Sequence, residues 1–149
     1  MGKLIAIVDP FPRTLELIFS KDKFKILRKK YELLYAPKNK KNFFYEKNIH
    51  KASFIIGQPD LPKNLLIKAK KLKAIINVES NFINNMDYQY CFKKGIHVIA
   101  TSPVFSKPVA EIALGMTLSL LRNIHTAHLD FIKGKEKYGL ESNLKASLL

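Results

Sequence analysis

Five short apolar runs, separated by polar loops and by stretches with helical spacing, constrain the fold of this 149-residue chain more than any other feature. We expect each run to be a β-strand, and the runs cover residues 4–8, 31–35, 54–56, 74–78 and 96–100. Continuous apolar strands that alternate with helices are typical of a parallel sheet with helices on both faces. The pattern therefore predicts an α/β, flavodoxin-like, doubly wound sheet of five parallel strands in the order 2-1-3-4-5.

Helical spacing fills most of the segments between these strands. Helices are expected at residues 14–19, 22–30, 38–51, 62–71 and 85–94, with Asn85 or Asp87 as the cap of the last one and Gly95 at its end. The longest helical pattern begins at about Lys107 or Pro108, with Pro108 in its first turn, and reaches Ile132. Its apolar face is expected at Val109, Ile112, Ala113, Met116, Leu120 and Ile124.

The formal net charge of +14 suggests a nucleic-acid ligand, but the kind of basic residue argues against it. The basic side chains are 23 lysines and only 3 arginines, and they are spread along the chain. Arginine is the residue that reads base edges and binds phosphates through two hydrogen bonds. We therefore interpret the charge as a solvated surface and expect no nucleic-acid partner; a nucleic-acid binder, the alternative, would show steep salt dependence of binding.

The N-terminal apolar run is too short for a signal peptide, because it ends at Asp9 and Pro10. No apolar stretch is expected to be long enough to cross a membrane. The single cysteine, Cys91, excludes an internal disulfide and a zinc site with several cysteines. These features predict a cytoplasmic protein with no membrane partner.

The spacing of the glycines and the surroundings of the histidines argue against a dinucleotide-binding loop and a metal site. None of the 6 glycines has the G-x-G-x-x-G spacing that holds a dinucleotide pyrophosphate. His125 and His128 stand three residues apart on one expected helix, but apart from Asp130 no carboxylate or cysteine lies near them, so we expect no metal site. His97 is expected to pack inside the last strand, and Cys91 to be buried.

Ligands of doubly wound folds bind at the carboxyl ends of the strands. Four segments follow strands here, at residues 9–11, 57–60, 79–82 and 101–105. A response-regulator receiver domain shares this strand order, but it needs a phospho-accepting aspartate directly after the third strand, where Gly57 and Gln58 stand. A receiver-like or other standalone binding module is the alternative to the interpretation that follows.

Several weak motifs between residues 72 and 122 occur together in one order and spacing. They are Leu72 to Phe82, Asn85 to Tyr88, Cys91 to Val98, Thr101 to Pro103, and Val109 to Glu111 at the start of a helix that reaches Leu121 and Arg122. This combination resembles the D-isomer-specific 2-hydroxyacid dehydrogenases. The resemblance implies an oxidoreductase subunit with a flavodoxin-like substrate-binding domain, an NAD- or NADP-binding Rossmann domain, and a substrate cleft between them.

The resemblance also implies where a small anionic 2-hydroxy or 2-oxo acid binds. In the family, the loop after the fourth strand offers backbone N–H groups to the substrate carboxylate; here that loop is Glu79, Ser80, Asn81 and Phe82. Exposed amides at a strand end are a natural anion site. Many family members carry a glycine in this loop, and Ser80 and Asn81 depart from that pattern. Pro10 and Phe11, after the first strand, are further candidate substrate contacts.

By the same resemblance, residues 1–103 are the substrate-binding domain, and residues 104–149 are the interdomain or dimerisation helix and the start of the nucleotide-binding domain. Ser102, Pro103 and Val109 are candidate contacts in the cleft. The family's catalytic Arg, Glu and His belong to a portion beyond residue 149, so the chain is expected to be truncated, to hold no catalytic residue and to bind NAD or NADP weakly. The helix over residues 109–132 is expected to contact the missing domain or a second copy of the chain.

Overall fold

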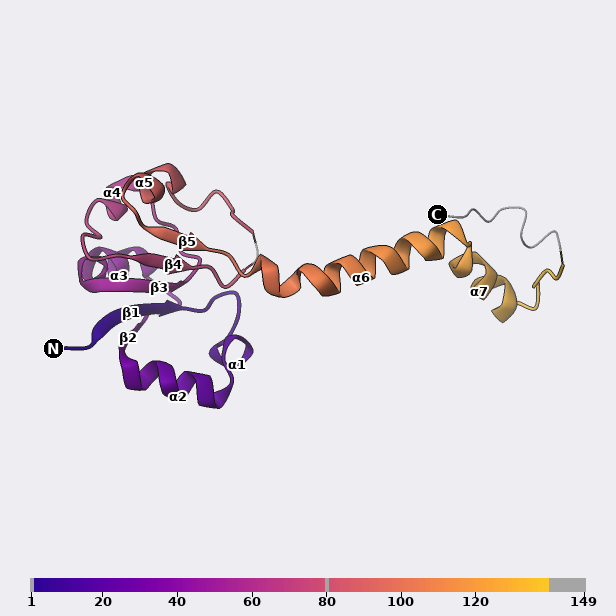
Figure 1. Ribbon diagram of the computed structural model, residues 1–149, viewed down its shortest axis with the longest axis horizontal. Coiled ribbons are helices and arrows are strands. Elements are labelled where there is room, and N and C mark those ends of the chain that lie inside the picture. Colours follow the sequence, from indigo (N-terminus) through magenta and orange to yellow (C-terminus); the bar gives the residue numbers. More distant parts are fainter. Residues whose placement is uncertain (1, 80, 140–149) are drawn as a thin grey trace. The chain divides into compact units, whose positions relative to one another are not determined.

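The computed structural model describes residues 2–79 and 81–139, and the chain forms two compact units, Met1–Pro103 and Val104–Leu149. The first unit is built on a sheet of five parallel strands (Figure 1). They are β1 (Leu4–Asp9), β2 (Tyr31–Tyr35), β3 (Ala52–Gly57), β4 (Ala74–Ile76) and β5 (His97–Ile99). Their order is β2-β1-β3-β4-β5, which confirms the predicted doubly wound fold.

Helices cover both faces of this sheet (Figure 1). They are α1 (Leu15–Ile18), α2 (Lys21–Lys30), α3 (Lys41–Asn48), α4 (Lys63–Leu66) and α5 (Tyr88–Lys93), with a 3₁₀ turn over Ile49–Lys51. Strand residues alternate between the two faces, so Ile55 packs in the core beneath α3, α4 and α5, while its neighbour Ile56 packs beneath α1 and α2. Full burial of such a side chain contributes about 1.5–3 kcal/mol.

Both ends of the helix α5 carry capping residues that the sequence predicts. The Asp87 carboxylate accepts a hydrogen bond of 2.8 Å from the backbone N–H of Tyr90 and so caps α5. Gly95 follows α5 with φ +70°, and the Ile96 N–H reaches back to the Cys91 carbonyl at 2.9 Å. This is the hydrogen-bond pattern of a Schellman turn, which needs a left-handed residue at the glycine position.

The strand β5 departs from expectation at His97. This side chain is exposed, whereas the apolar run around it predicted a packed one. The reason is that β5 is an edge strand: among the described residues, β4 alone pairs with it, so the sheet covers β5 less completely. Cys91, in contrast, is fully buried in α5, as predicted.

The predicted helix from Lys107 or Pro108 to Ile132 is wrong at its start and in its continuity. The chain forms α6 (Ser102–Leu121) and α7 (Ile124–Ile132) instead. Pro103 stands in the first turn of α6, where its missing N–H costs nothing, and Pro108 lies inside the helix. Asn123, at φ 54°, adopts the left-handed conformation that separates the two helices.

Within the second unit, α6 and α7 bury no residue. Apolar side chains of the expected face, such as Val109, Ile112 and Met116, are exposed. Contrary to the sequence-based expectation, α6 is long and apolar enough to cross a membrane, since Lys107 and Glu111 are its only charged residues. Length and composition alone are weak evidence for a span, because helices in the core of soluble proteins meet the same criteria.

Candidate functional site

The carboxyl ends of the strands carry three loops that approach one another. We call them the β1 loop (residues 10–14), the β3 loop (residues 58–60) and the β4 loop (residues 77–85). Parallel strands place these loops at one edge of the sheet, where doubly wound folds bind ligands. Of the candidate substrate contacts, Pro10 and Phe11 lie in the β1 loop, and Glu79, Asn81 and Phe82 in the β4 loop; Ser80 lies outside the described residues.

Arg13 and Glu79 join the β1 loop to the β4 loop. The Arg13 Nε donates to Glu79 Oε1 at 2.7 Å, and its Nη2 donates to Oε2 at 3.2 Å. These hydrogen bonds from the guanidinium lower the pKa of Glu79 and raise the pKa of Arg13. The negative charge of Glu79 is therefore balanced by Arg13. An unpaired carboxylate would repel the second carboxylate that this loop is expected to receive.

Gln58 joins the β3 loop to the β4 loop. Its Nε2 donates a hydrogen bond of 2.8 Å to the backbone carbonyl of Asn81. The next residue, Phe82, is 56% exposed and packs its ring edge-on against Tyr88, with centroids 5.3 Å apart. The backbone N–H groups of Phe82 and Ile83 have no hydrogen-bond partner among residues 2–79 and 81–139. Two consecutive exposed residues thus carry amide donors that no described residue uses.

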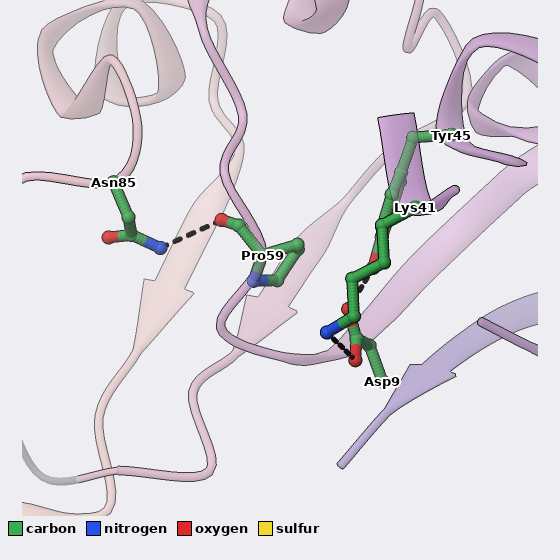
Figure 2. Close-up of polar contacts among 5 residues, drawn as sticks. All are labelled: Asp9, Lys41, Tyr45, Pro59 and Asn85. Atoms are coloured by element: carbon green, nitrogen blue, oxygen red, sulfur yellow. Dashed lines mark hydrogen bonds and ion pairs between the residues drawn. The ribbon is translucent and has the colours of Figure 1, made fainter. Parts of the chain in front are cut away.

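A partly buried ionic network lies at the end of β1, and Figure 2 shows it. The Asp9 side chain is 3% exposed; its Oδ1 accepts from Lys41 Nζ at 2.7 Å and its Oδ2 from the Tyr45 hydroxyl at 3.3 Å. Burial, followed by the charge of Asp9, raises the pKa of Tyr45, so this hydroxyl stays a donor. Lys41 also lies over the Phe11 ring, 5.1 Å from its centroid.

Figure 2 also shows how Asn85 fixes the far end of the β4 loop. Its Nδ2 donates to the Pro59 carbonyl at 2.8 Å, and its Oδ1 accepts from the Tyr88 hydroxyl at 2.8 Å. The β4 loop is therefore attached to its surroundings at Glu79, at Asn81 and at Asn85. Such attachment favours a preorganised binding loop, because little conformational entropy remains to be lost on binding.

A cavity of about 660 Å³ opens beside the β1 loop, a size common for small-molecule sites. Its lining is largely apolar and includes the candidate residues Pro10 and Phe11. Lys38 brings positive charge to it, whereas the charges of Arg13 and Lys41 are already balanced by Glu79 and Asp9. The cavity suits a small, partly apolar anion.

Within the described part of the chain, several buried polar atoms without a hydrogen-bond partner lie at the same edge of the sheet. They are Gln58 Oε1, both amide atoms of Asn77, and Thr101 Oγ1, which follow β3, β4 and β5 respectively. Such atoms are rare in native interiors and cost free energy. Their clustering indicates that this edge is shaped for something other than stability.

The other candidates lie elsewhere in the chain. Ser102 and Pro103 begin α6, and Val109 lies further along the same helix in the second unit. Among the residues that the structure describes, no three His, Cys, Asp or Glu side chains are grouped to hold a metal ion.

Sequence reasoning missed Arg13, Lys41 and Gln58. Gln58 lies in a strand-end segment, Arg13 lies just after one, and Lys41 begins α3. The partners of the two cations are far along the chain: Glu79 lies 66 residues from Arg13, and Asp9 lies 32 residues from Lys41. One signal was present, since Arg13 is among only 3 arginines and stands in a strand-end loop.

The strand order and the covering helices define a doubly wound α/β domain, a class of fold whose ligands bind at the carboxyl edge of the sheet. Residues 6–139 match the family described as "D-isomer specific 2-hydroxyacid dehydrogenase, catalytic domain", and the chain belongs to this family. The family predicted from the sequence is thereby confirmed. No curated protein matches the chain in sequence.

Solved structures agree with this assignment. The chain is 42% identical to a phosphoglycerate oxidoreductase from Rhizobium etli, with a TM-score of 0.74, over 99% of this chain and 45% of the other. It shares the fold of the D-lactate dehydrogenase from Aquifex aeolicus complexed with NAD and lactic acid, at 23% identity and a TM-score of 0.57, over 92% of this chain and 39% of the other. The chain thus spans less than half the length of these relatives.

Proposed function

We propose that this chain is the substrate-binding domain of an NAD(P)-dependent D-2-hydroxyacid dehydrogenase, and that its β4 loop binds the carboxylate of a 2-hydroxy or 2-oxo acid. The observation that carries the proposal is the pair of unpartnered N–H groups at Phe82 and Ile83, in a loop attached at Glu79, Asn81 and Asn85. Consecutive amide donors of this kind bind anions. The neighbouring relatives support the substrate class, because one was solved with lactic acid.

A proline substitution tests the role of the Phe82 N–H. The F82P variant lacks this donor, and F82A keeps it while removing the same ring. A hydrogen bond to a charged group contributes about 1.5–3 kcal/mol, so F82P should weaken binding of oxamate or pyruvate at least tenfold relative to F82A. Titrations followed by amide NMR should also shift the Phe82 and Ile83 signals of the unmodified chain. Equal affinities of F82P and F82A, or shifts confined to other loops, would overturn the proposal.

The dinucleotide cofactor does not fit the residues of this chain. Gly57 ends β3, but it is followed by Gln-Pro-Asp and not by a glycine loop at a helix N-terminus. No G-x-G-x-x-G spacing occurs among the 6 glycines. We propose that the 149-residue chain alone transfers no hydride. Steady-state oxidation of NADH with a panel of 2-oxo acids tests this, and clear turnover by the purified chain would contradict it.

The second unit is proposed to contact another domain or a second copy of the chain. Exposed apolar side chains along α6 and α7, among them Val109, Ile112 and Leu120, support a protein partner for these helices. Sedimentation of the purified chain should show concentration-dependent self-association, and I112D with L120D should abolish it. Sedimentation as a monomer at all concentrations would exclude the homodimer.

We also propose a cytoplasmic location; partition of the chain into the membrane fraction of cells would contradict it.

A further inference from the structure

Gln58 stands at a rigid point of the sheet. It directly follows Gly57, whose φ of +153° and close approach to β1 leave no room for a side chain: a Cβ there would lie 2.3 Å from the Asp9 carbonyl oxygen. Gly57 pairs with Asp9 in the register of β1 and β3. The backbone from which the Gln58 side chain extends is therefore held firmly in place.

The amide of Gln58 is oriented by the β4 loop. Its Nε2 donates to the Asn81 carbonyl at 2.8 Å, while its Oε1 is buried and finds no hydrogen-bond partner among residues 2–79 and 81–139. A carbonyl oxygen only accepts, so the NH₂ end of the amide must face it and the oxygen end is left unsatisfied. A buried acceptor without a hydrogen bond lowers the free energy of unfolding. A methionine at position 58 would fill a similar volume without burying such an acceptor.

The hydrogen bond at Asn81 fixes the direction of the following N–H. The only cis peptide bond among the described residues joins Phe11 to Pro12, so the peptide between Asn81 and Phe82 is trans. In a planar trans peptide the C=O and the N–H point in opposite directions. When Gln58 holds the Asn81 carbonyl, the Phe82 N–H must point away from Gln58, and this N–H is one of the two unpartnered donors.

We propose that Gln58 is a positioning residue for substrate binding, which acts through the Asn81 carbonyl to aim the Phe82 N–H at the carboxylate of the 2-hydroxy or 2-oxo acid. This inference rests on the proposed function of the β4 loop. Gln58 itself does not touch the ligand in this arrangement. Its contribution is to keep the Asn81–Phe82 peptide from rotating, so that the donor is already oriented when the anion arrives.

The test compares Q58M with Q89M. Methionine fills the volume of glutamine without donating a hydrogen bond, and Gln89 is an exposed residue of α5 and so provides a matched control. Carbon and nitrogen NMR shifts of the Asn81 carbonyl and the Phe82 amide, measured without ligand, report the hydrogen bond. Oxamate and pyruvate titrations report affinity. Should Q58M fail to fold, Q58N serves the same purpose, because its shorter amide cannot reach Asn81.

We expect Q58M to shift the Asn81 and Phe82 signals in the ligand-free chain and to weaken oxamate binding roughly tenfold, while Q89M changes neither. Unchanged affinity of Q58M, with the unmodified chain binding normally, would overturn the inference and leave the proposed function standing. Unchanged Asn81 and Phe82 signals in Q58M would also overturn it, whether or not a ligand binds. Failure of the unmodified chain to bind any 2-oxo acid would instead overturn the proposed function and, with it, the ligand assigned here.

Discussion

The guanidinium of Arg13 and the carboxylate of Glu79 meet through two hydrogen bonds, 2.7 and 3.2 Å long, across 66 residues of sequence. Both side chains are partly exposed, at 46% and 30%, so solvent screens their attraction. The pair therefore adds little to stability. Its larger effect is local: it places a neutralised carboxylate, instead of a free one, at the start of the β4 loop.

Acid should release this contact. Arg13 lowers the folded-state pKa of Glu79 below the value of the unfolded chain. The stabilisation is therefore complete above the unfolded pKa and is lost as the pH falls through the lowered folded value. At pH 7 we expect the melting temperature of R13Q to lie slightly below that of the unmodified chain. Near pH 3 we expect the two melting temperatures to be equal. Circular dichroism melts across this range test the prediction, and a difference that does not depend on pH would contradict it.

Removing Lys41 should be far more costly than removing an exposed lysine. K41M leaves the Asp9 carboxylate, only 3% exposed, without its cation. Because Lys41 is itself 30% exposed, we expect a loss of about 2–4 kcal/mol, somewhat below that of a fully buried pair. K68M breaks the exposed pair of Lys68 with Glu46 and should cost less than about 1 kcal/mol. Urea unfolding measures both, and D9N combined with K41M should recover part of the loss.

Two glycines with positive φ should respond differently to alanine. At Gly95, φ is +70° and no atom lies within 4 Å of the added Cβ, so G95A should cost about 1–2 kcal/mol from backbone strain alone. At Gly57 the added Cβ would lie 2.3 Å from the Asp9 carbonyl oxygen, so β1 and β3 must separate. We expect G57A to cost more than about 4 kcal/mol or to prevent folding. Equal urea midpoints for the two variants would contradict this account of Gly57.

The fold could be predicted because its signals are local. Apolar runs such as residues 4–8 and 74–78 mark strands by their composition, and Asp87 and Gly95 mark the ends of α5 by their own conformational preferences. The break at Asn123 escaped prediction because the apolar spacing continues from α6 into α7, and one left-handed residue leaves that spacing intact. The start of α6 was predicted too late, at Lys107 or Pro108, because a proline fits the first turn equally well at Pro103.

The candidate site could be predicted only in part. Strand order places the loops after β1, β3 and β4 at one edge, so the location of Phe11 and Phe82 at the candidate site follows from topology. The pairing of Arg13 with Glu79, and of Gln58 with the Asn81 carbonyl, depends on loop conformations that no periodic pattern encodes. Glu79 and Asn81 could thus be assigned to a ligand loop, but the residues that hold that loop could not.

Cys91 should be almost inert to thiol reagents while the first unit is folded. Its side chain is fully buried, and burial, followed by the charge of Asp87, raises the pKa of the thiol, so the reactive thiolate is scarce at pH 8. Labelling must then wait for opening of α5, whose first turn is capped by Asp87. D87A removes this cap at a cost of about 1 kcal/mol and should speed labelling roughly fivefold, whereas D60A, which alters an exposed aspartate, should not. Mass spectrometry after timed exposure to iodoacetamide measures these rates. Labelling of the unmodified chain as fast as a free cysteine, or equal rates for D87A and D60A, would contradict the buried, capped environment of Cys91.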